Sequence, residues 1–233
     1  MLQPNCTVYA DLTSEYHLPA GVTTIGKQPD GIVTWSLKNA SGDIPDTHKE
    51  FIAIASGITQ WGLQLKNVTF HNVPSSLNAN VKIEFVKPGD PRYSGLFVSN
   101  STLAQTYFPI PQNGALSGCM FLNGDFREIF SLDGAPIPCS QALASGHATG
   151  CVDPNQLIQT YKLSKVTRHE FGHALGLPHL DKGNTMTAFY QDMPDKLGPE
   201  DIQVAQGLYG DRGMEQHIID SVDSLVARSV GLI

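Results

Sequence analysis

The chain has 233 residues, of which 41% are hydrophobic and 16% are charged, and its formal net charge is −7. The normal apolar content excludes an intrinsically disordered chain and predicts one sizeable domain rather than two very small ones. The net negative charge disfavours a general nucleic-acid binder, which needs clustered Lys and Arg, and no apolar run approaches the roughly 18–20 residues that span a bilayer.

The first half of the chain predicts strands around one helix. Residues 32–37 are typical of a strand, and residues 45–63 carry apolar side chains at helical spacing, with Asp46 or Thr47 able to cap the start. Gly and Pro residues punctuate the later part of this half, as expected for turns between short strands. Further strands are expected over residues 68–70, 81–85, 103–108 and 119–122.

The second half predicts mainly helices. A long helix is expected from about residue 154 to residue 175, and a shorter one over residues 199–209, where Pro199 fits the first turn. Residues 214–229 are amphipathic and predict a helical tail packed on the domain, because their polar side is not basic as in a membrane-binding helix. Strand, helix, strands and then helices indicate an α+β domain with a mixed sheet.

The cysteines and the glycosylation sequons favour a secreted protein. The even number of cysteines is compatible with two disulfides, whose connectivity the sequence does not give, and four buried free thiols are the alternative. The cysteines are Cys6, Cys119, Cys139 and Cys151. Asn-x-Ser/Thr sequons, which accept N-linked glycans in secreted proteins, begin at Asn5, Asn39, Asn67 and Asn100.

The most informative stretch is residues 169–179, with the sequence HEFGHALGLPH. His169 and His173 are four residues apart, so on a helix they lie on nearly the same face, about 6 Å apart along the axis, and can bind one ion. Gly176 permits a left-handed end of the helix, after which the chain can bring His179 to the same ion. Three imidazoles and one position left for water are typical of a catalytic zinc site.

Glu170 follows the first of these histidines, so its carboxylate can lie beside the open position rather than on the metal. There it would take a proton from zinc-bound water and pass it to the leaving amine, while zinc polarises the scissile carbonyl. Ordinary surface histidines and a zinc site kept only for stability are the alternatives. A structural zinc site needs neither a Glu at this place nor an open ligand position, so the pattern favours catalysis.

This extended zinc motif, followed by Met186 seven residues after His179, resembles the metzincin metallopeptidases. The short span to Met186, the edge strand and the closing helix resemble the matrixins, the matrix metalloproteinase type, over about residues 30–210. The resemblance implies a twisted mixed five-stranded sheet with an active-site helix and a C-terminal helix. It also implies one catalytic Zn²⁺ with a Met-containing turn beneath it.

The matrixin resemblance assigns further site residues. Leu103 and Ala104 fall on the edge strand that pairs with an extended substrate. Tyr190 falls on the wall of the S1′ pocket, and Lys165 falls where matrixins tune the depth of that pocket, although a Lys165 that points to solvent is an equal alternative. Asp201 falls where the family uses a carboxylate to brace the Met turn, the alternative being a solvated Asp in the first turn of a helix.

The chain also departs from the matrixin pattern. Leu180 replaces the usual Ser or Thr after the third His, and Ala188 stands where some other metzincins have a Tyr that approaches the metal. The segment between residues 85 and 103 lacks the His- and Asp-rich loop that binds a structural zinc and calcium in vertebrate matrixins. We therefore expect no second zinc, and Ca²⁺ binding stays open. Residues 119–151 look like an insertion closed by a disulfide, most simply Cys139–Cys151.

Matrixin zymogens place a PRCGVPD segment across the zinc with its Cys as the fourth ligand. Residues 4–8, with the sequence PNCTV, match this segment in part, so Cys6 is a candidate latency ligand, with a disulfide or a free thiol as the alternatives. The expected organisation is an N-terminal extension over residues 1–30, a matrixin-like zinc peptidase domain over 31–210, and a helical C-terminal extension over 211–233.

These features together predict a secreted, monomeric zinc endopeptidase with protein or peptide substrates and no nucleic-acid or membrane partner. Glu170 would be the general base, and His169, His173 and His179 the metal ligands. The alternative from another class is an inactive metzincin-like module for binding or adhesion. The presence of all three ligands together with Glu170 disfavours that alternative.

Overall fold

The computed structural model describes residues 6, 27–28, 31–86, 90, 96–97, 102–109, 117–124, 129–146, 148 and 150–211. The helical tail predicted over residues 214–229 and most of the predicted N-terminal extension lie outside the described residues. Among the residues that are described, none belongs to a helix long and apolar enough to cross a membrane.

A five-stranded mixed sheet forms one layer of the domain, in the order β2-β1-β3-β5-β4, which confirms the predicted sheet. Four strands run parallel, and β4 pairs with β5 in the antiparallel sense at one edge. The strands are β1 (Gly31–Leu37), β2 (Val68–Asn72), β3 (Val81–Val86), β4 (Ala104–Thr106) and β5 (Cys119–Asn123).

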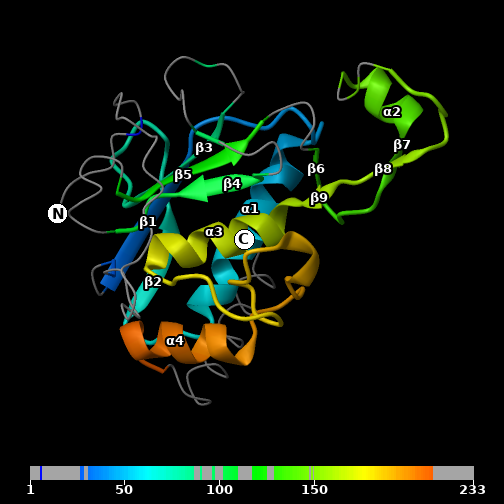
Figure 1. Cartoon of the computed structure of the whole chain (residues 1–233). Coiled ribbons are helices and arrows are strands. Elements are labelled where there is room, and N and C mark those ends of the chain that lie inside the picture. Colours follow the sequence, from blue (N-terminus) through cyan, green and yellow to red (C-terminus); the bar gives the residue numbers. More distant parts are fainter. Residues whose placement is uncertain are drawn as a thin grey trace, which may run out of the picture.

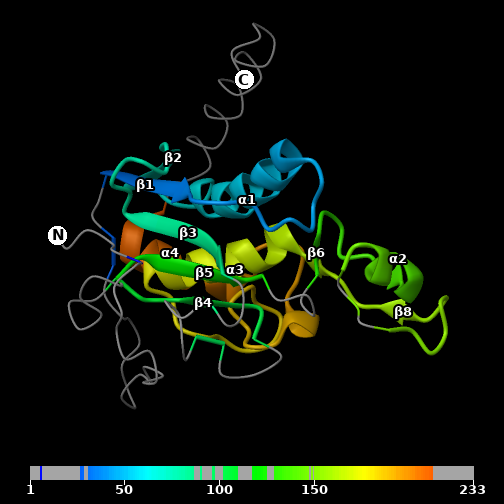
Figure 2. The same cartoon turned by 90° about the horizontal axis from the view of Figure 1, so that it is seen from above.

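Helices α1 (Thr47–Gly62) and α3 (Leu163–Leu175) run side by side against the sheet, as Figures 1 and 2 show. Asp46 caps α1, because its carboxylate accepts the backbone N–H groups of His48 and Lys49. The apolar side of α1 and the inner side chains of β1 and β3 form the main core with the apolar residues of α3. The Trp61 indole donates a hydrogen bond to the backbone carbonyl of Arg168, 2.9 Å away, and so links α1 to the middle of α3.

The prediction that a helix starts near residue 154 is wrong. Helix α3 begins at Leu163, and the preceding residues form two short strands, β8 (Leu157–Ile158) and β9 (Tyr161–Lys162). These strands pair with β7 (Ile137–Pro138) and β6 (Phe130–Ser131), respectively. The backbone groups of this stretch therefore pair with strands that lie 19 to 31 residues earlier in the sequence, and a local reading of the sequence cannot detect such partners.

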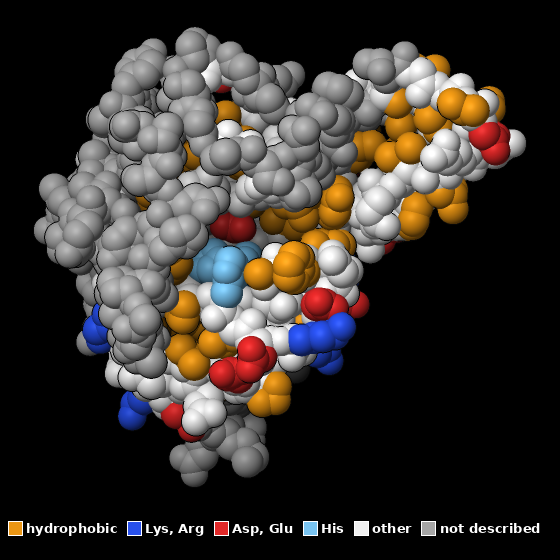
Figure 3. Space-filling view, viewed as in Figure 1, with side chains coloured by type: hydrophobic (Ala, Val, Ile, Leu, Met, Phe, Trp, Pro, Cys, Tyr) orange, Lys and Arg blue, Asp and Glu red, His pale blue; other side chains and the backbone are white. Residues whose placement is uncertain are grey.

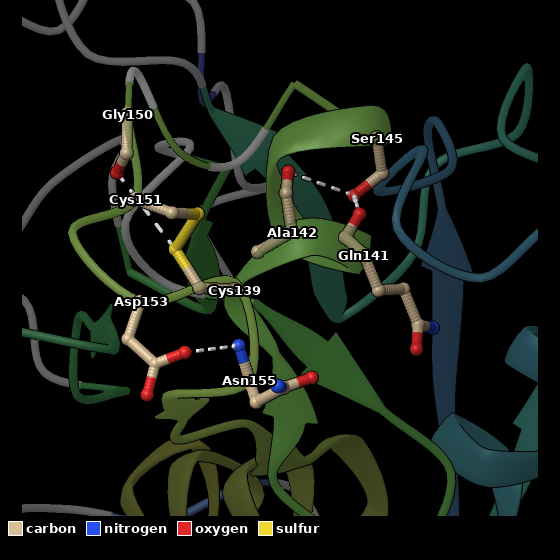
Figure 4. The surroundings of a disulfide bond; sticks show 8 residues. All are labelled: Cys139, Gln141, Ala142, Ser145, Gly150, Cys151, Asp153 and Asn155. Carbon is tan, nitrogen blue, oxygen red and sulfur yellow. Dashed lines mark hydrogen bonds between the residues drawn. A yellow bond between two sulfur atoms is a disulfide. The ribbon is translucent and has the colours of Figure 1, made fainter.

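Residues 132–160 form an arm that projects from the domain, with β7, α2 (Cys139–Ala144) and β8 at its outer part (Figures 1 and 2). The predicted disulfide between Cys139 and Cys151 is confirmed and joins the start of α2 to the returning chain (Figure 4). At the base of the arm, the hydroxyls of Ser131 and Thr160 lie 2.7 Å apart. The arm is thus an insertion with its own covalent link, which leaves and re-enters the domain at one place. The predicted bounds of 119–151 are wrong, because residues 119–123 form β5 of the central sheet.

The second disulfide joins Cys6 to Cys119 at the start of β5. The interpretation of Cys6 as a latency ligand is therefore wrong for this structure, because a sulfur bound to another cysteine has no thiolate to offer a metal. Cys6 is buried beside Val86, Leu96 and Phe121 and ties the N-terminal part of the chain to the central sheet.

Helix α4 (Pro199–Tyr209), which has the predicted bounds, fixes the C-terminal end of α3. The Tyr209 hydroxyl donates to the carbonyl of Leu175 at 2.7 Å and accepts the backbone N–H of Gln28 at 2.8 Å. The Gln28 side chain donates to the carbonyl of Ala174. The last carbonyls of a helix have no partner within it, so these contacts satisfy groups that would otherwise be buried and unpaired.

We expect Tyr209→Phe to lower the free energy of unfolding by about 1–3 kcal/mol, because the change leaves the carbonyl of Leu175 and the N–H of Gln28 without this buried partner. Urea unfolding of the parent and the variant measures the difference. A change smaller than about 0.5 kcal/mol, the range of ordinary surface substitutions, would contradict this role.

Candidate active site

Three histidines converge at the end of α3. His169 and His173 lie one helical turn apart, and Gly176 ends the helix with a φ of 101°, in the left-handed region. The chain then turns so that His179 meets the other two, and one ring nitrogen from each lies within 4.8 Å of the others. Figure 3 shows histidine side chains gathered in a hollow of the surface, directly beside an acidic side chain.

Backbone carbonyls fix the tautomers of the two helical histidines. The Nδ1 atom of His169 lies 2.8 Å from the carbonyl oxygen of Thr185, and Nδ1 of His173 lies 2.8 Å from that of Leu177. Because a carbonyl only accepts, Nδ1 carries the proton in each ring, and Nε2 keeps a free lone pair.

The donor set fits a zinc ion. The Nε2 atoms of His173 and His179 are 3.3 Å apart. Two nitrogens that each lie about 2.0–2.1 Å from one tetrahedral zinc ion are separated by about 3.3–3.4 Å, so the observed spacing is that of two ligands of a common ion. Burial lowers the pKa of His169 to about 4 and that of His173 well below its usual value. Both rings are therefore neutral at pH 7, as metal ligands must be.

Glu170 lies beside the three histidines and outside the set of converging nitrogens. Its Oε2 atom accepts a hydrogen bond of 2.7 Å from the hydroxyl of Thr106 on β4. Burial raises the pKa of Glu170 to about 7, and the hydrogen bond from Thr106 opposes this rise. The site thus holds an acidic group that exchanges its proton near neutral pH.

Met186 is fully buried, in a turn whose backbone contacts both α3 and the segment that follows His179. The carbonyl of Thr185 contacts His169, and the carbonyl of Met186 accepts the N–H of Leu180, directly after the third histidine. Asp201 at the start of α4 accepts the backbone N–H groups of both Thr185 and Met186. Asp201 thus contacts the turn directly rather than lying solvated in the first turn of α4.

Arg168 is a site residue that the sequence analysis missed. It is 2% exposed and lies on α3 directly before His169. Its guanidinium donates to the hydroxyl of Thr185 and to the backbone carbonyls of Pro194 and Asp195. A charged residue next to the zinc motif is the only signal in the sequence, and it does not reveal which carbonyls the side chain binds.

The predicted pocket residues lie next to one another. Tyr190 is held by its hydroxyl, which accepts the backbone N–H of Lys162 at 2.8 Å. The ammonium of Lys165 lies 4.5 Å from the centre of the Tyr190 ring, a cation–π distance, and burial lowers its pKa. Lys165 thus packs on the aromatic ring rather than simply extending into solvent.

Within the part of the chain that the structure describes, β4 is the edge strand of the sheet, and no strand pairs with its outer side. The carbonyl of Leu103 accepts the N–H of Asn123, and both backbone groups of Tyr107 bond to the segment at the start of β5. Since backbone groups alternate between the two sides of a strand, the N–H and C=O groups of Ala104 and Thr106 face away from β5. The structure therefore places Ala104 at the open edge, whereas the carbonyl of Leu103 is used within the sheet.

The glycine at position 172 allows the Met turn to approach α3. A Cβ atom at Gly172 would overlap the sulfur of Met186 and lie 2.9 Å from an indole carbon of Trp61. We expect Gly172→Ala to lower the free energy of unfolding by about 1–3 kcal/mol through overpacking, measured by chemical denaturation. Gly207→Ala in α4 is the matched control, because its Cβ would meet nothing within 4 Å. Equal stabilities of the two variants would contradict this explanation.

The comparisons with known proteins agree with this geometry. The model of the matrixin family, a group of peptidases, matches residues 27–210. Metalloendoproteinase 1 of Glycine max is 27% identical over 174 residues, which are 72% of this chain and 47% of that protein. Interstitial collagenase of Bos taurus is 34% identical over 99 residues, 39% of this chain and 21% of that protein.

A third relative, a probable matrix metalloproteinase 095L of Invertebrate iridescent virus 3, is 50% identical over 46 residues, 19% of this chain and 13% of that protein. The chain thus spans less than half the length of each of these curated relatives. Because the family model covers most of the chain, from before β1 to the end of α4, the chain belongs to the matrixin family.

Proposed function

We propose that this chain is a zinc-dependent endopeptidase that hydrolyses peptide bonds in proteins. The observation that carries the proposal is the convergence of three imidazole nitrogens beside the carboxylate of Glu170. Membership of the matrixin family and relatives named as metalloproteinases support it. His169, His173 and His179 would hold the ion through Nε2.

A zinc ion bound there lowers the pKa of water and polarises the scissile carbonyl. Glu170 acts as the general base: its carboxylate accepts a proton from the attacking water and transfers it to the nitrogen of the leaving amine. The C–O bond to the carbonyl carbon forms first, and the C–N bond breaks once the nitrogen has accepted the proton, so the water supplies the hydroxyl of the new carboxyl group and the proton of the new amine. Met186 and Asp201 hold the floor of the site in place beneath the ligands.

The substrate lies extended along β4 and adds a strand through main-chain hydrogen bonds to Ala104 and Thr106. Tyr190 and Lys165 line the pocket for the side chain that follows the scissile bond. Lys165 occupies space beside the Tyr190 ring, so it makes this pocket shallow and favours small apolar residues.

Secretion and a monomeric state are further parts of the proposal. Two disulfides support an oxidising, extracellular environment. Asn39 and Asn67, which begin two of the glycosylation sequons, are exposed.

We expect Glu170→Ala to lower kcat by about 10²- to 10⁴-fold while the chain still binds one zinc ion, because the carboxylate acts on the proton and not on the metal. Cleavage of a mixed peptide library and elemental analysis measure the two quantities. Wild-type protein treated with a chelator is the control for metal dependence. If the zinc-loaded wild type shows no chelator-sensitive cleavage, the chain is instead an inactive binding module.

We expect Lys165→Ala to raise kcat/KM for peptides with Leu or Phe after the scissile bond by about tenfold or more relative to peptides with Ala there, because the pocket becomes deeper. Lys182→Ala is the matched control, since the Lys182 side chain is 79% exposed and paired with Asp192. Unchanged preferences in the Lys165 variant would show that this side chain does not set the depth of the pocket.

A further inference from the structure

We propose that Thr106 is a positioning residue for Glu170, and that it couples substrate docking on β4 to the placement of the catalytic carboxylate. This inference rests on the proposed peptidase function. Thr106 and Glu170 are 64 residues apart in the sequence and come from different elements, the edge strand and the central helix.

The contact between them is short and shielded from water. The hydroxyl of Thr106 donates to Oε2 of Glu170 at 2.7 Å, and the two residues are 8% and 6% exposed. A hydrogen bond to an ionised carboxylate in such an environment is among the stronger ones in proteins. The hydrogen bond occupies one lone pair of Oε2, and the remaining lone pairs of the carboxylate can accept a proton from water.

The hydrogen bond also restricts the orientation of the glutamate. A Glu side chain has three rotatable torsions and samples several rotamers unless it is held. Thr106, in contrast, is β-branched and therefore stiff at its single heavy-atom torsion. The Thr106 hydroxyl is consequently the more rigid partner, and it sets the orientation of the Glu170 carboxylate.

The same residue faces the substrate through its backbone. The N–H and C=O groups of Thr106 point to the open edge of β4, whereas its side chain reaches α3. The pairing of Thr106 with Met120 on β5 holds the strand in register. A peptide that pairs with β4 therefore binds to the residue that orients the base, so the scissile bond and the carboxylate are aligned by one short strand.

Thr106→Val keeps the shape of the side chain and removes the donor, and Thr106→Ser keeps the donor. We expect Thr106→Val to lower kcat about 10- to 100-fold, with KM and zinc affinity changed less than about threefold, and Thr106→Ser to stay within a few fold of the wild type. Gln105→Ala is the control for disturbance of β4, because its side chain points to the opposite face of the strand. A wild-type kcat in Thr106→Val would overturn the proposal.

A double-mutant cycle tests whether Thr106 acts through Glu170. In the Glu170→Ala background, we expect Thr106→Val to change the residual rate less than twofold, since the group that it positions is already absent. A further loss as large as that in the wild-type background would overturn the proposal, because it would show an effect independent of the carboxylate.

Crystal structures of the metal-free wild type and of metal-free Thr106→Val separate this inference from the proposed function. The Glu170 carboxylate should lie in one orientation in the wild type and should be displaced or distributed over several in the variant, with Thr106→Ala as a second variant if the first does not fold. An unchanged carboxylate would overturn the proposal. Inactivity of the zinc-loaded wild type, by contrast, would refute the peptidase function. The two crystal structures would then still show whether Thr106 sets the orientation of the Glu170 carboxylate.

Discussion

Three imidazole lone pairs that point at one another repel unless a cation lies between them, and much of the structure serves to hold them in that arrangement. Carbonyls of Thr185 and Leu177 fix the protons of two rings on the outer nitrogen. The Thr185 carbonyl is itself fixed, because Asp201 binds the turn and α4 anchors Asp201. Backbone carbonyls, the Met turn and α4 therefore all contribute to the orientation of the ligand rings.

Consecutive residues of α3 contact different parts of the molecule. Arg168 binds the carbonyls of the segment that follows Tyr190, His169 and Glu170 face the site, and the backbone of Arg168 is tied to α1 through Trp61. Buried arginines are costly unless their donors are satisfied, and here two backbone carbonyls and the side chains of Thr185 and Gln60 accept from the guanidinium. One helix therefore sets the positions of two metal ligands, of Glu170 and of the segment after Tyr190 relative to one another.

The sequence predicted those features that depend on short spacings. The histidines, Gly176, the Met turn and the bounds of α4 all follow from local patterns, and the mixed sheet follows from the order of elements. Features that depend on distant partners were not predictable. The start of α3 depends on pairing with β6, Thr106 meets Glu170 across 64 residues, and Cys6 pairs with Cys119 across 113 residues.

The arm over residues 132–160 is built so that it could be shortened or replaced without changing the rest of the domain. Ser131 and Thr160, where the chain leaves and returns, are in hydrogen-bond contact, so a few residues could bridge the gap without altering the path from β6 to β9. Its covalent link is internal and does not involve the sheet. Sequence change can therefore accumulate in the outer part of the arm, whereas its base at Gly134 lies against Tyr190 and is more constrained.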